Sequence, residues 1–514
     1  MNGGPMSVQS LEATPPQAPV AAPAPGLHNA DLAPVPKEKK TWGWFEIFNV
    51  WTNDVQSLAG YTLAASLFIT SGLNGWWVFA AIILAGAFVN WLVNLTGSPS
   101  VKHGVPYAVM ARLSMGVLGA KFPALVRGIV AIFWYGAQTY FASTAVALAI
   151  NAAVGNPGGG TFMGLDAVGW ISYVIVALLQ VLLFTRGIDV IARFLNFAGP
   201  AVYAVMVVLL IIIWVRAGGD MLPAVGSIFS DSDVTGWAAV AAFFGVVGTM
   251  IAYFSAVIIN FGDFSRFSRT EKEMKIGNFT GLPLSLAFFT FLSLFITAGA
   301  YVVFQDGQGQ PMDNPADIVE QTESVVLAII AAVTFLLATV GINLVANFIP
   351  PAYDLANLAP QKISFKAGGY ITAAVGFVIG AFWVAVIDEI GLPTFVDTLG
   401  AMLAPLYGVL VVDYYIVRRK HVRTEDMFSM NSDGPYYYTR GWNVRALVAV
   451  ALAAVFAISA VWVPALGMLS GFAWVIGALI GGVLYWAVMR NHNPSVRVGA
   501  APPPPGIDAA PSVS

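Results

Sequence analysis

Residues 324–348 have the sequence SVVLAIIAAVTFLLATVGINLVANF, without Asp, Glu, Lys or Arg. At a rise of about 1.5 Å per residue, a helix of this length exceeds the roughly 30 Å hydrocarbon layer of a membrane. The stretch also lacks the strict apolar–polar alternation that a strand of a membrane barrel requires. It therefore predicts a transmembrane helix.

The chain contains further apolar runs of comparable length, separated by shorter polar segments. We expect them at 46–71, 74–97, 123–150, 168–186, 195–217, 237–260, 282–304, 367–387, 393–417, 442–463 and 468–489. Together with 324–348 they predict an all-α polytopic membrane protein with twelve transmembrane helices. The spans are numbered 1 to 12 along the chain, so that 324–348 is span 8.

The composition agrees with a membrane location. The chain of 514 residues is 58% apolar and only 10% charged. Soluble proteins carry about 25% charged residues, so this chain could not cover a water-exposed surface of its size. Cysteine is absent, and all four His lie outside the apolar runs. We therefore expect no resident metal and no cofactor.

The basic residues predict the orientation of the chain. With the spans numbered in order, 23 of the 24 Lys and Arg residues fall on the side of the N-terminal tail, and only Arg216 falls on the other. Because Lys and Arg are retained in the cytoplasm, we expect both termini there, in a multi-pass protein of the plasma (inner) membrane. The Pro-rich ends, 1–40 and 491–514, are expected to be disordered cytoplasmic tails.

Polar residues inside a span mark candidate sites, since a polar group in hydrocarbon is costly unless it is paired or lines a cavity. Span 1 contains the run Trp51-Thr52-Asn53-Asp54-Val55-Gln56-Ser57. A break in the helix here would free backbone carbonyls for a cation or a substrate. Packing against neighbouring helices is the alternative interpretation of Asn53, Asp54 and Gln56.

Two pairs of residues lie four positions apart, and so on one face of a helix. Trp134 and Gln138 in span 3 suit a flat heterocycle, because an indole can stack on it while an amide offers a donor and an acceptor. Asn343 and Asn347 have the same spacing in span 8. For Gln138 alone, a hydrogen bond between helices explains the residue equally well.

Several short motifs occur in a familiar order between about Trp44 and Arg445. They are the span 1 region around Trp51, Gly104-Val105-Pro106-Tyr107, Trp134-Tyr135-Gly136-Ala137-Gln138-Thr139, Asn260-Phe261-Gly262-Asp263-Phe264-Ser265-Arg266-Phe267, the segment from Ala338 to Tyr353, and Asp413-Tyr414-Tyr415-Ile416-Val417-Arg418-Arg419. In these motifs the chain resembles the nucleobase–cation symporter-1 family, which includes cytosine, uracil, allantoin and hydantoin permeases.

The resemblance implies a particular architecture. It implies a transporter core over 41–420 (spans 1–10), built as a five-plus-five inverted repeat with broken helices 1 and 6. It implies that 421–490 holds two peripheral helices, spans 11 and 12. Such a fold alternates access around a site near the middle of the membrane, between spans 1, 3, 6 and 8.

The same resemblance implies roles for individual residues. Trp134 would stack on the substrate ring, while Gln138 and Asn347 hydrogen-bond it. A second stacking position falls on Phe254, where the hydantoin transporter has Trp, and Tyr253 stands in place of a Gly. The span 1 amide of that transporter falls on Ser57, with Gln56 adjacent. Because Tyr253 narrows the pocket and adds a hydroxyl, we expect a small ring such as uracil, cytosine or allantoin.

The coupling ion is predicted from what the chain lacks. Sodium-coupled members hold the ion between span 1 and two hydroxyls of span 8. The equivalent positions here are Asn53 and Gln56 on span 1, with Ala338, Gly341 and Ile342 on span 8, which carry no hydroxyl. A hard cation needs several oxygen ligands, so we expect a proton rather than sodium. Asp54 is the candidate proton carrier; a purely structural Asp54 is the alternative.

The sequence thus predicts a symporter that imports a nucleobase or a related small heterocycle, with a proton as the second solute. The alternatives are the same fold carrying a vitamin-like pyrimidine or pyridine or a hydantoin, or coupling to sodium at a different site. An enzyme is disfavoured because paired catalytic groups inside the membrane are missing, and a channel because the polar residues cluster at one depth.

Overall fold

The structure is a computed structural model that describes residues 24, 26–155, 158–227 and 234–491. Within these residues the chain is helical, and its β contacts are isolated bridges such as Trp42–Ser268. Among the described residues, eleven helices are long and apolar enough to cross a membrane. Of the twelve expected spans, the first is not among these eleven, because it consists of two shorter helices. The all-α membrane fold is therefore confirmed, whereas the count of twelve stays a prediction.

The helices follow the apolar runs closely. Spans 1 to 5 correspond to α1 (Trp44–Val55) with α2 (Leu58–Thr70), α3 (Gly75–His103), α6 (Lys121–Val154), α7 (Ala167–Thr185) and α8 (Ile188–Ala217). Spans 6 to 8 correspond to α10 (Gly236–Tyr253) with α11 (Ser255–Asn260), to α13 (Glu271–Phe279), η3 (Thr280–Leu284) and α14 (Ser285–Gln305), and to α16 (Val325–Ile342), η4 (Asn343–Phe348) and α17 (Ile349–Leu358).

Spans 9 to 12 correspond to α18 (Phe365–Ile390), α19 (Leu392–Val412) with η5 (Asp413–Val417), α20 (Val444–Trp462) and α21 (Ala473–Met489). The connections hold η1 (Lys37–Lys39), α4 (Tyr107–Met110), α5 (Arg112–Met115), η2 (Gly218–Asp220), α9 (Met221–Ser227), α12 (Gly262–Ser265), α15 (Pro315–Glu320), η6 (Glu425–Phe428) and η7 (Pro464–Phe472).

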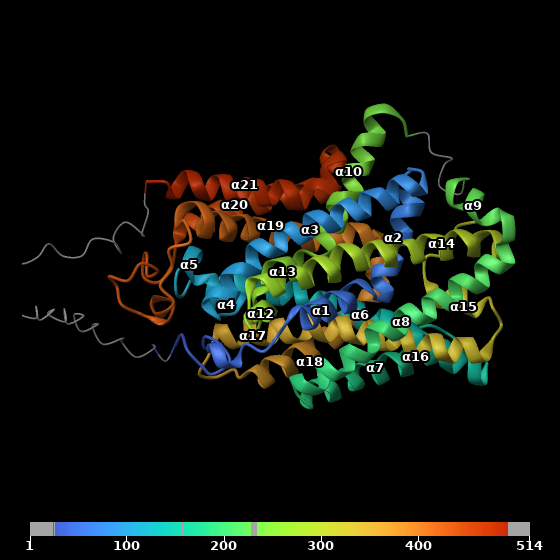
Figure 1. The fold of residues 1–514 in the computed structure, drawn as a ribbon, viewed down its shortest axis with the longest axis horizontal. Coiled ribbons are helices and arrows are strands. Elements are labelled where there is room, and N and C mark those ends of the chain that lie inside the picture. Colours follow the sequence, from blue (N-terminus) through green and yellow to red (C-terminus); the bar gives the residue numbers. More distant parts are fainter. Residues whose placement is uncertain (1–23, 25, 156–157, 228–233, 492–514) are drawn as a thin grey trace, which may run out of the picture.

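The long helices run roughly along one axis of the molecule (Figure 1). α6 packs against α16, α17 and α18, while α3 packs against α10 and α14. The close approach of α6 and α18 depends on small residues, because a Cβ on Gly136 would lie 2.7 Å from the backbone nitrogen of Gly380. α20 and α21 pack on α19 and lie along one outer edge of the bundle (Figure 1).

Three of the long helices contain a π-helical segment, η3, η4 and η5. A π-helix widens the turn and redirects side chains, and such segments are frequent at functional sites. η4 contains both Asn343 and Asn347, so the helix is irregular where span 8 carries its amides.

Part of the expected N-terminal tail is packed onto the bundle. Leu27 and Leu32 are fully buried beside Val109 and Phe428. The backbone N–H of Val35 donates to the carbonyl of Gly104 over 2.8 Å. The structure thus differs from the expected disorder over 26–40, because two leucines fill a hollow between connecting loops. Residues 1–23, 25 and 492–514 of the expected tails lie outside the described residues.

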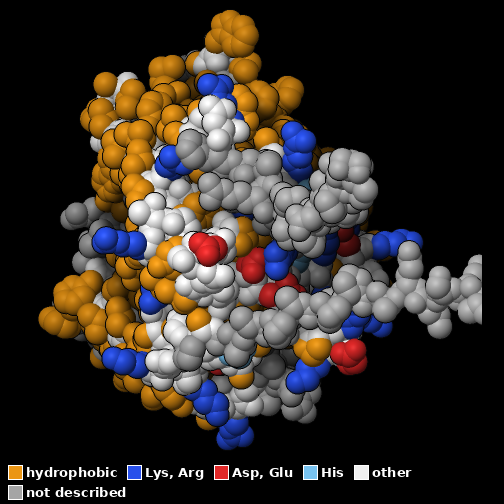
Figure 2. Space-filling model, turned by 90° about the vertical axis from the view of Figure 1, so that its left-hand side faces the viewer, with side chains coloured by type: hydrophobic (Ala, Val, Ile, Leu, Met, Phe, Trp, Pro, Cys, Tyr) orange, Lys and Arg blue, Asp and Glu red, His pale blue; other side chains and the backbone are white. Residues whose placement is uncertain are grey.

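Basic side chains gather at one end of the molecule, where the described chain both begins and ends (Figure 2). Hydrophobic side chains cover the left and upper margins of the molecule in this view. This distribution is the one that the basic loops predict. That this end faces the cytoplasm remains a prediction.

A buried ion pair lies at the C-terminal end of span 10, at the same end of the molecule. The Arg418 guanidinium donates to the carboxylate of Asp413 over 2.7 Å, and both side chains are 1% exposed. Asp413 also accepts from the hydroxyl of Tyr485 over 2.6 Å, and Arg418 donates to the carbonyl of Leu113 and to the Tyr438 hydroxyl. The pair therefore joins η5 to α21 and α5.

Removing one partner should leave the other charged and buried. We expect Arg418→Met to lower the free energy of unfolding by about 3–5 kcal/mol. The matched control is Arg419→Met at the adjacent exposed position, which removes the same charge. Thermal unfolding of the two detergent-purified variants checks this, and equal melting temperatures would contradict it.

Candidate functional site

The first span is interrupted at Gln56 and Ser57. α1 ends at Val55, and Ser57 begins α2 by accepting a hydrogen bond from the backbone N–H of Gly60 over 2.9 Å. The freed N–H of Leu58 donates to the hydroxyl of Thr339 on α16 over 3.1 Å. Thus span 8 satisfies a backbone donor that the interruption leaves without a partner inside its own helix.

The sixth span is irregular at Phe254, a single residue between α10 and α11 whose backbone stays in the right-handed helical region. The hydroxyl of Tyr253, the last residue of α10, lies 3.1 Å from the Ser57 hydroxyl. Both side chains are buried. A hydrogen bond therefore joins the two interrupted spans directly to each other.

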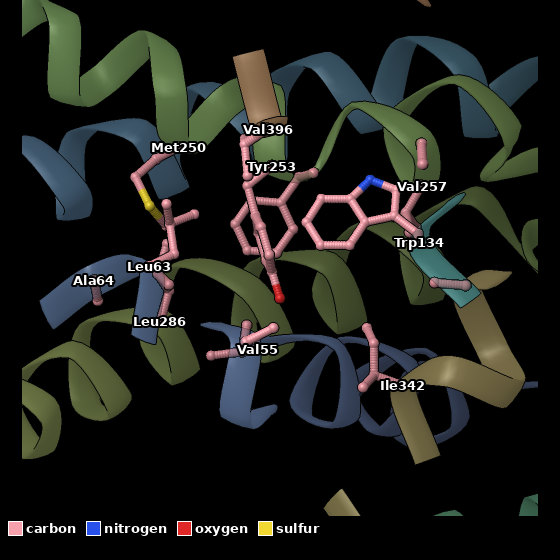
Figure 3. Close-up of a cluster of buried hydrophobic side chains, with 14 of the residues drawn as sticks. Val55, Leu63, Ala64, Trp134, Met250, Tyr253, Val257, Leu286, Ile342 and Val396 are labelled. Atoms are coloured by element: carbon pink, nitrogen blue, oxygen red, sulfur yellow. The ribbon is translucent and has the colours of Figure 1, made fainter. Parts of the chain in front are cut away.

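Trp134 of span 3 meets this junction. Its indole lies edge-to-face against the Tyr253 ring, with centroids 5.4 Å apart and planes at 89°. Figure 3 shows the Tyr253 ring beside the indole and its hydroxyl directed between Val55 and Ile342. Phe254 instead packs edge-on against Trp51, at 6.2 Å. In this conformation the aromatic partner of Trp134 on span 6 is Tyr253.

Two buried side-chain amides, one on span 3 and one at the interruption of span 1, have unused hydrogen-bonding capacity. Gln138 lies beside the Tyr253 hydroxyl, and its buried Oε1 has no hydrogen-bond partner among the described residues. Gln56 lies beside Tyr203, but that hydroxyl donates to the carbonyl of Ser285 over 3.1 Å. Both amide atoms of Gln56 lack a described partner. Buried amides in this state are suited to receive a polar guest.

The predicted residue Asn347 belongs to a chain of amides that sequence analysis found only in part. Asn347 donates to Asn343 over 3.0 Å, and Asn343 donates to Gln180 of span 4 over 2.6 Å and to the Thr139 hydroxyl over 3.2 Å. Gln180 was missed, although it is a polar residue in the middle of an apolar run. The chain fixes the orientation of the Asn347 side chain.

Asp54 lies on the last turn of α1 and is 3% exposed. Its Oδ2 has no hydrogen-bond partner among the described residues. Within the part of the chain that the structure describes, no Lys, Arg or His lies within 4.0 Å of it.

The residues that the family resemblance equates with a sodium site lie on spans 1 and 8. Asn53 donates to the carbonyl of Asn49 over 2.8 Å. Ala338, Gly341 and Ile342 are buried at the end of α16. The neighbouring hydroxyl, that of Thr339, accepts the hydrogen bond from Leu58 described above.

Comparison with known proteins adds independent information. The profile of a family described as "Permease for cytosine/purines, uracil, thiamine, allantoin" matches residues 34–488. The allantoin permease of Bacillus subtilis (strain 168) is 33% identical over 479 residues, covering 91% of this chain and 94% of that protein. The purine-uracil permease NCS1 of Arabidopsis thaliana is 28% identical, covering 91% and 78%.

Among solved structures, the fold is similar to that of Mhp1, a nucleobase-cation-symport-1 family transporter, in a closed conformation with bromovinylhydantoin bound. The TM-score is 0.74 at 23% sequence identity, and the match covers 90% of this chain and 95% of that one. At this identity the likeness concerns the fold.

The hydrogen bond from Leu58 to Thr339 can be tested without any transport assay. We expect Thr339→Val to lower the free energy of unfolding by about 1–3 kcal/mol, because the Leu58 N–H would be buried without an acceptor. Thr334→Val is the matched control, since that buried hydroxyl donates to Ile330 within its own helix over 2.7 Å. Thermal unfolding should separate the two variants, and equal losses would refute the special role of Thr339.

Proposed function

We propose that this member of the family of permeases for cytosine/purines, uracil, thiamine and allantoin imports a small planar heterocycle by symport. Because the chain belongs to that family, it is a transporter and not an enzyme. Uracil, cytosine and allantoin are the substrates that we propose. The observation that supports this most is the meeting of Trp134, Gln138 and Tyr253 at the interrupted spans 1 and 6. An aromatic face and free amide atoms lie together there, away from water.

The proposed substrates share a chemistry that fits these groups. Uracil, cytosine and allantoin each present ring N–H groups next to carbonyls, and a side-chain amide offers the complementary acceptor and donor. Gln138, Gln56 and Asn347 supply three such amides. With stacking and hydrogen bonds each contributing about 1 kcal/mol, several contacts together reach the roughly 8 kcal/mol of micromolar binding.

Binding requires Tyr253 to move. The edge-to-face contact of 5.4 Å with Trp134 leaves no gap for a ring between the two side chains. A guest that lies between the two rings therefore displaces the phenol and strains its hydrogen bond to Ser57. In this proposal the substrate itself loosens the contact between spans 1 and 6. Phe254, turned toward Trp51, is the alternative second stacking residue.

The proposed second solute is a proton. Asp54 is a buried acid without a described cation, and the span 8 positions Ala338, Gly341 and Ile342 offer no hydroxyl to a sodium ion. The Thr339 hydroxyl already accepts from Leu58. Sodium at a different site is the competing proposal, and the two differ in the gradient that drives uptake.

Recognition by Trp134 can be measured in cells that express the protein. We expect Trp134→Ala to raise the substrate concentration that gives half-maximal uptake by about tenfold or more, because an aromatic contact and its buried area are lost. Trp134→Phe retains a stacking face and should stay within a few-fold of the parent chain. Competition of labelled uracil by unlabelled cytosine, allantoin, hydantoins, purines and a vitamin-like pyrimidine identifies the substrate class. Equal affinity of the parent and the Ala variant would contradict the site.

The coupling proposal predicts which gradient supports uptake. We expect accumulation to rise as the external pH falls, to collapse with a protonophore, and to be unchanged when sodium is replaced by choline. Asp54→Asn should abolish accumulation against a gradient while the matched change Asp306→Asn, at the exposed end of α14, leaves it intact. Accumulation by Asp54→Asn with an unchanged pH profile would remove Asp54 from the mechanism.

A further inference from the structure

A buried acid that forms no ion pair with a described residue lies on α19, apart from Asp54 and from the paired Asp413. Asp397, in the second turn of α19, is 4% exposed. Its Oδ2 accepts a hydrogen bond from the Thr249 hydroxyl of α10 over 3.2 Å and from the Ser470 hydroxyl of η7 over 3.2 Å. One carboxyl group thus holds together three segments that are far apart in the sequence.

The surroundings of Asp397 offer no compensating charge. Within the described residues, no Lys, Arg or His lies within 4.0 Å of it. The elements packed on α19 include α10, α20, η7 and α21, and the one titratable residue of α21, Tyr485, donates to Asp413 near the other end of α19. Of these, η7 has no titratable residue, α10 has only Tyr253, and α20 has only Arg445. The end of α20 that lies near Asp397 is the one with Trp462, whose indole N–H donates to Thr398. Arg445 lies at the opposite end of α20. Asp388 and Glu389 of the neighbouring α18 have side chains outside the description.

Asp397 is connected to the candidate substrate site by two short routes. Thr249 lies four residues before Tyr253, one helical turn away on the same side of α10. Phe395 lies two residues before Asp397, and its ring contacts Trp134 with centroids 4.9 Å apart. The carboxyl group therefore lies within about one helical turn of a residue in contact with each aromatic side chain of the site.

We propose that Asp397 binds a transported proton, and that its protonation resets the junction of α10, α19 and η7. As a carboxylate it accepts from both hydroxyls. When the proton is on Oδ2, the atom that accepts both hydrogen bonds, that oxygen carries a hydrogen of its own to donate and keeps only one lone pair, so one of the two hydroxyls must turn its hydrogen elsewhere. The proton is taken up from one side of the membrane and released to the other, and no covalent bond besides O–H is made or broken. The proposal rests on the proposed function and extends its proton pathway beyond Asp54.

The test uses the full chain in proteoliposomes with a labelled substrate that the parent protein accumulates. Asp397→Asn keeps the size of the side chain and one acceptor oxygen for the two hydroxyls but cannot bind and release a proton. We expect accumulation driven by a pH gradient to fall by about tenfold or more, while counterflow exchange, which needs no net proton movement, stays within a few-fold of the parent. Asp397→Glu, which restores an acid, should recover part of the accumulation.

Two further variants keep the acid and change only its donors. Thr249→Val and Ser470→Ala each remove one hydroxyl from the carboxylate, so the pH midpoint of uptake should move upward. They also decide the matter if Asp397→Asn fails to fold. Asp397→Asn with parental accumulation and pH profile, or an unmoved midpoint in both hydroxyl variants, overturns the role of Asp397 and leaves the proposed function standing. A parent protein that ignores the pH gradient and the protonophore overturns both.

Discussion

Hydrocarbon provides no partner for a backbone N–H or carbonyl, so a helix can be interrupted inside a membrane only where other parts of the protein satisfy the freed groups. In this chain the interruption at Gln56 and Ser57 meets that condition through the Ser57 cap and the Thr339 hydroxyl. The same interruption brings Ser57 to Tyr253 of the sixth span. The candidate site exists because these hydrogen bonds permit two irregular segments to lie side by side.

The long helices were predictable because hydropathy over about 20 residues depends on composition alone. Span 8, expected over 324–348, is α16 with η4, and the polar run in span 1 marks the place where α1 ends. The irregular turn at Asn343 was not predictable, because a π-helical segment depends on contacts with neighbouring helices rather than on its own residues.

The burial of the candidate residues was predictable from the sequence, but their packing was not, and their roles in binding remain a prediction. Trp134 and Gln138 are buried together as their spacing indicates. Whether Tyr253 or Phe254 faces Trp134 depends on the rotation of the helix at the interruption, which sequence periodicity does not fix. Gln180 and Asp397 were overlooked because a lone polar residue hardly changes the hydropathy of its run. Leu27 and Leu32 were assigned to a tail because their partners come from distant loops.

The central claim is that a planar heterocycle binds between Trp134 and Tyr253 at the interrupted spans. A structure of the protein determined with bound uracil or allantoin tests it most directly. We expect the ring to stack on the Trp134 indole within hydrogen-bonding distance of Gln138. The Tyr253 hydroxyl should then be displaced from Ser57. A ligand bound elsewhere, with the contact of Tyr253 to Ser57 and Trp134 intact, would contradict it.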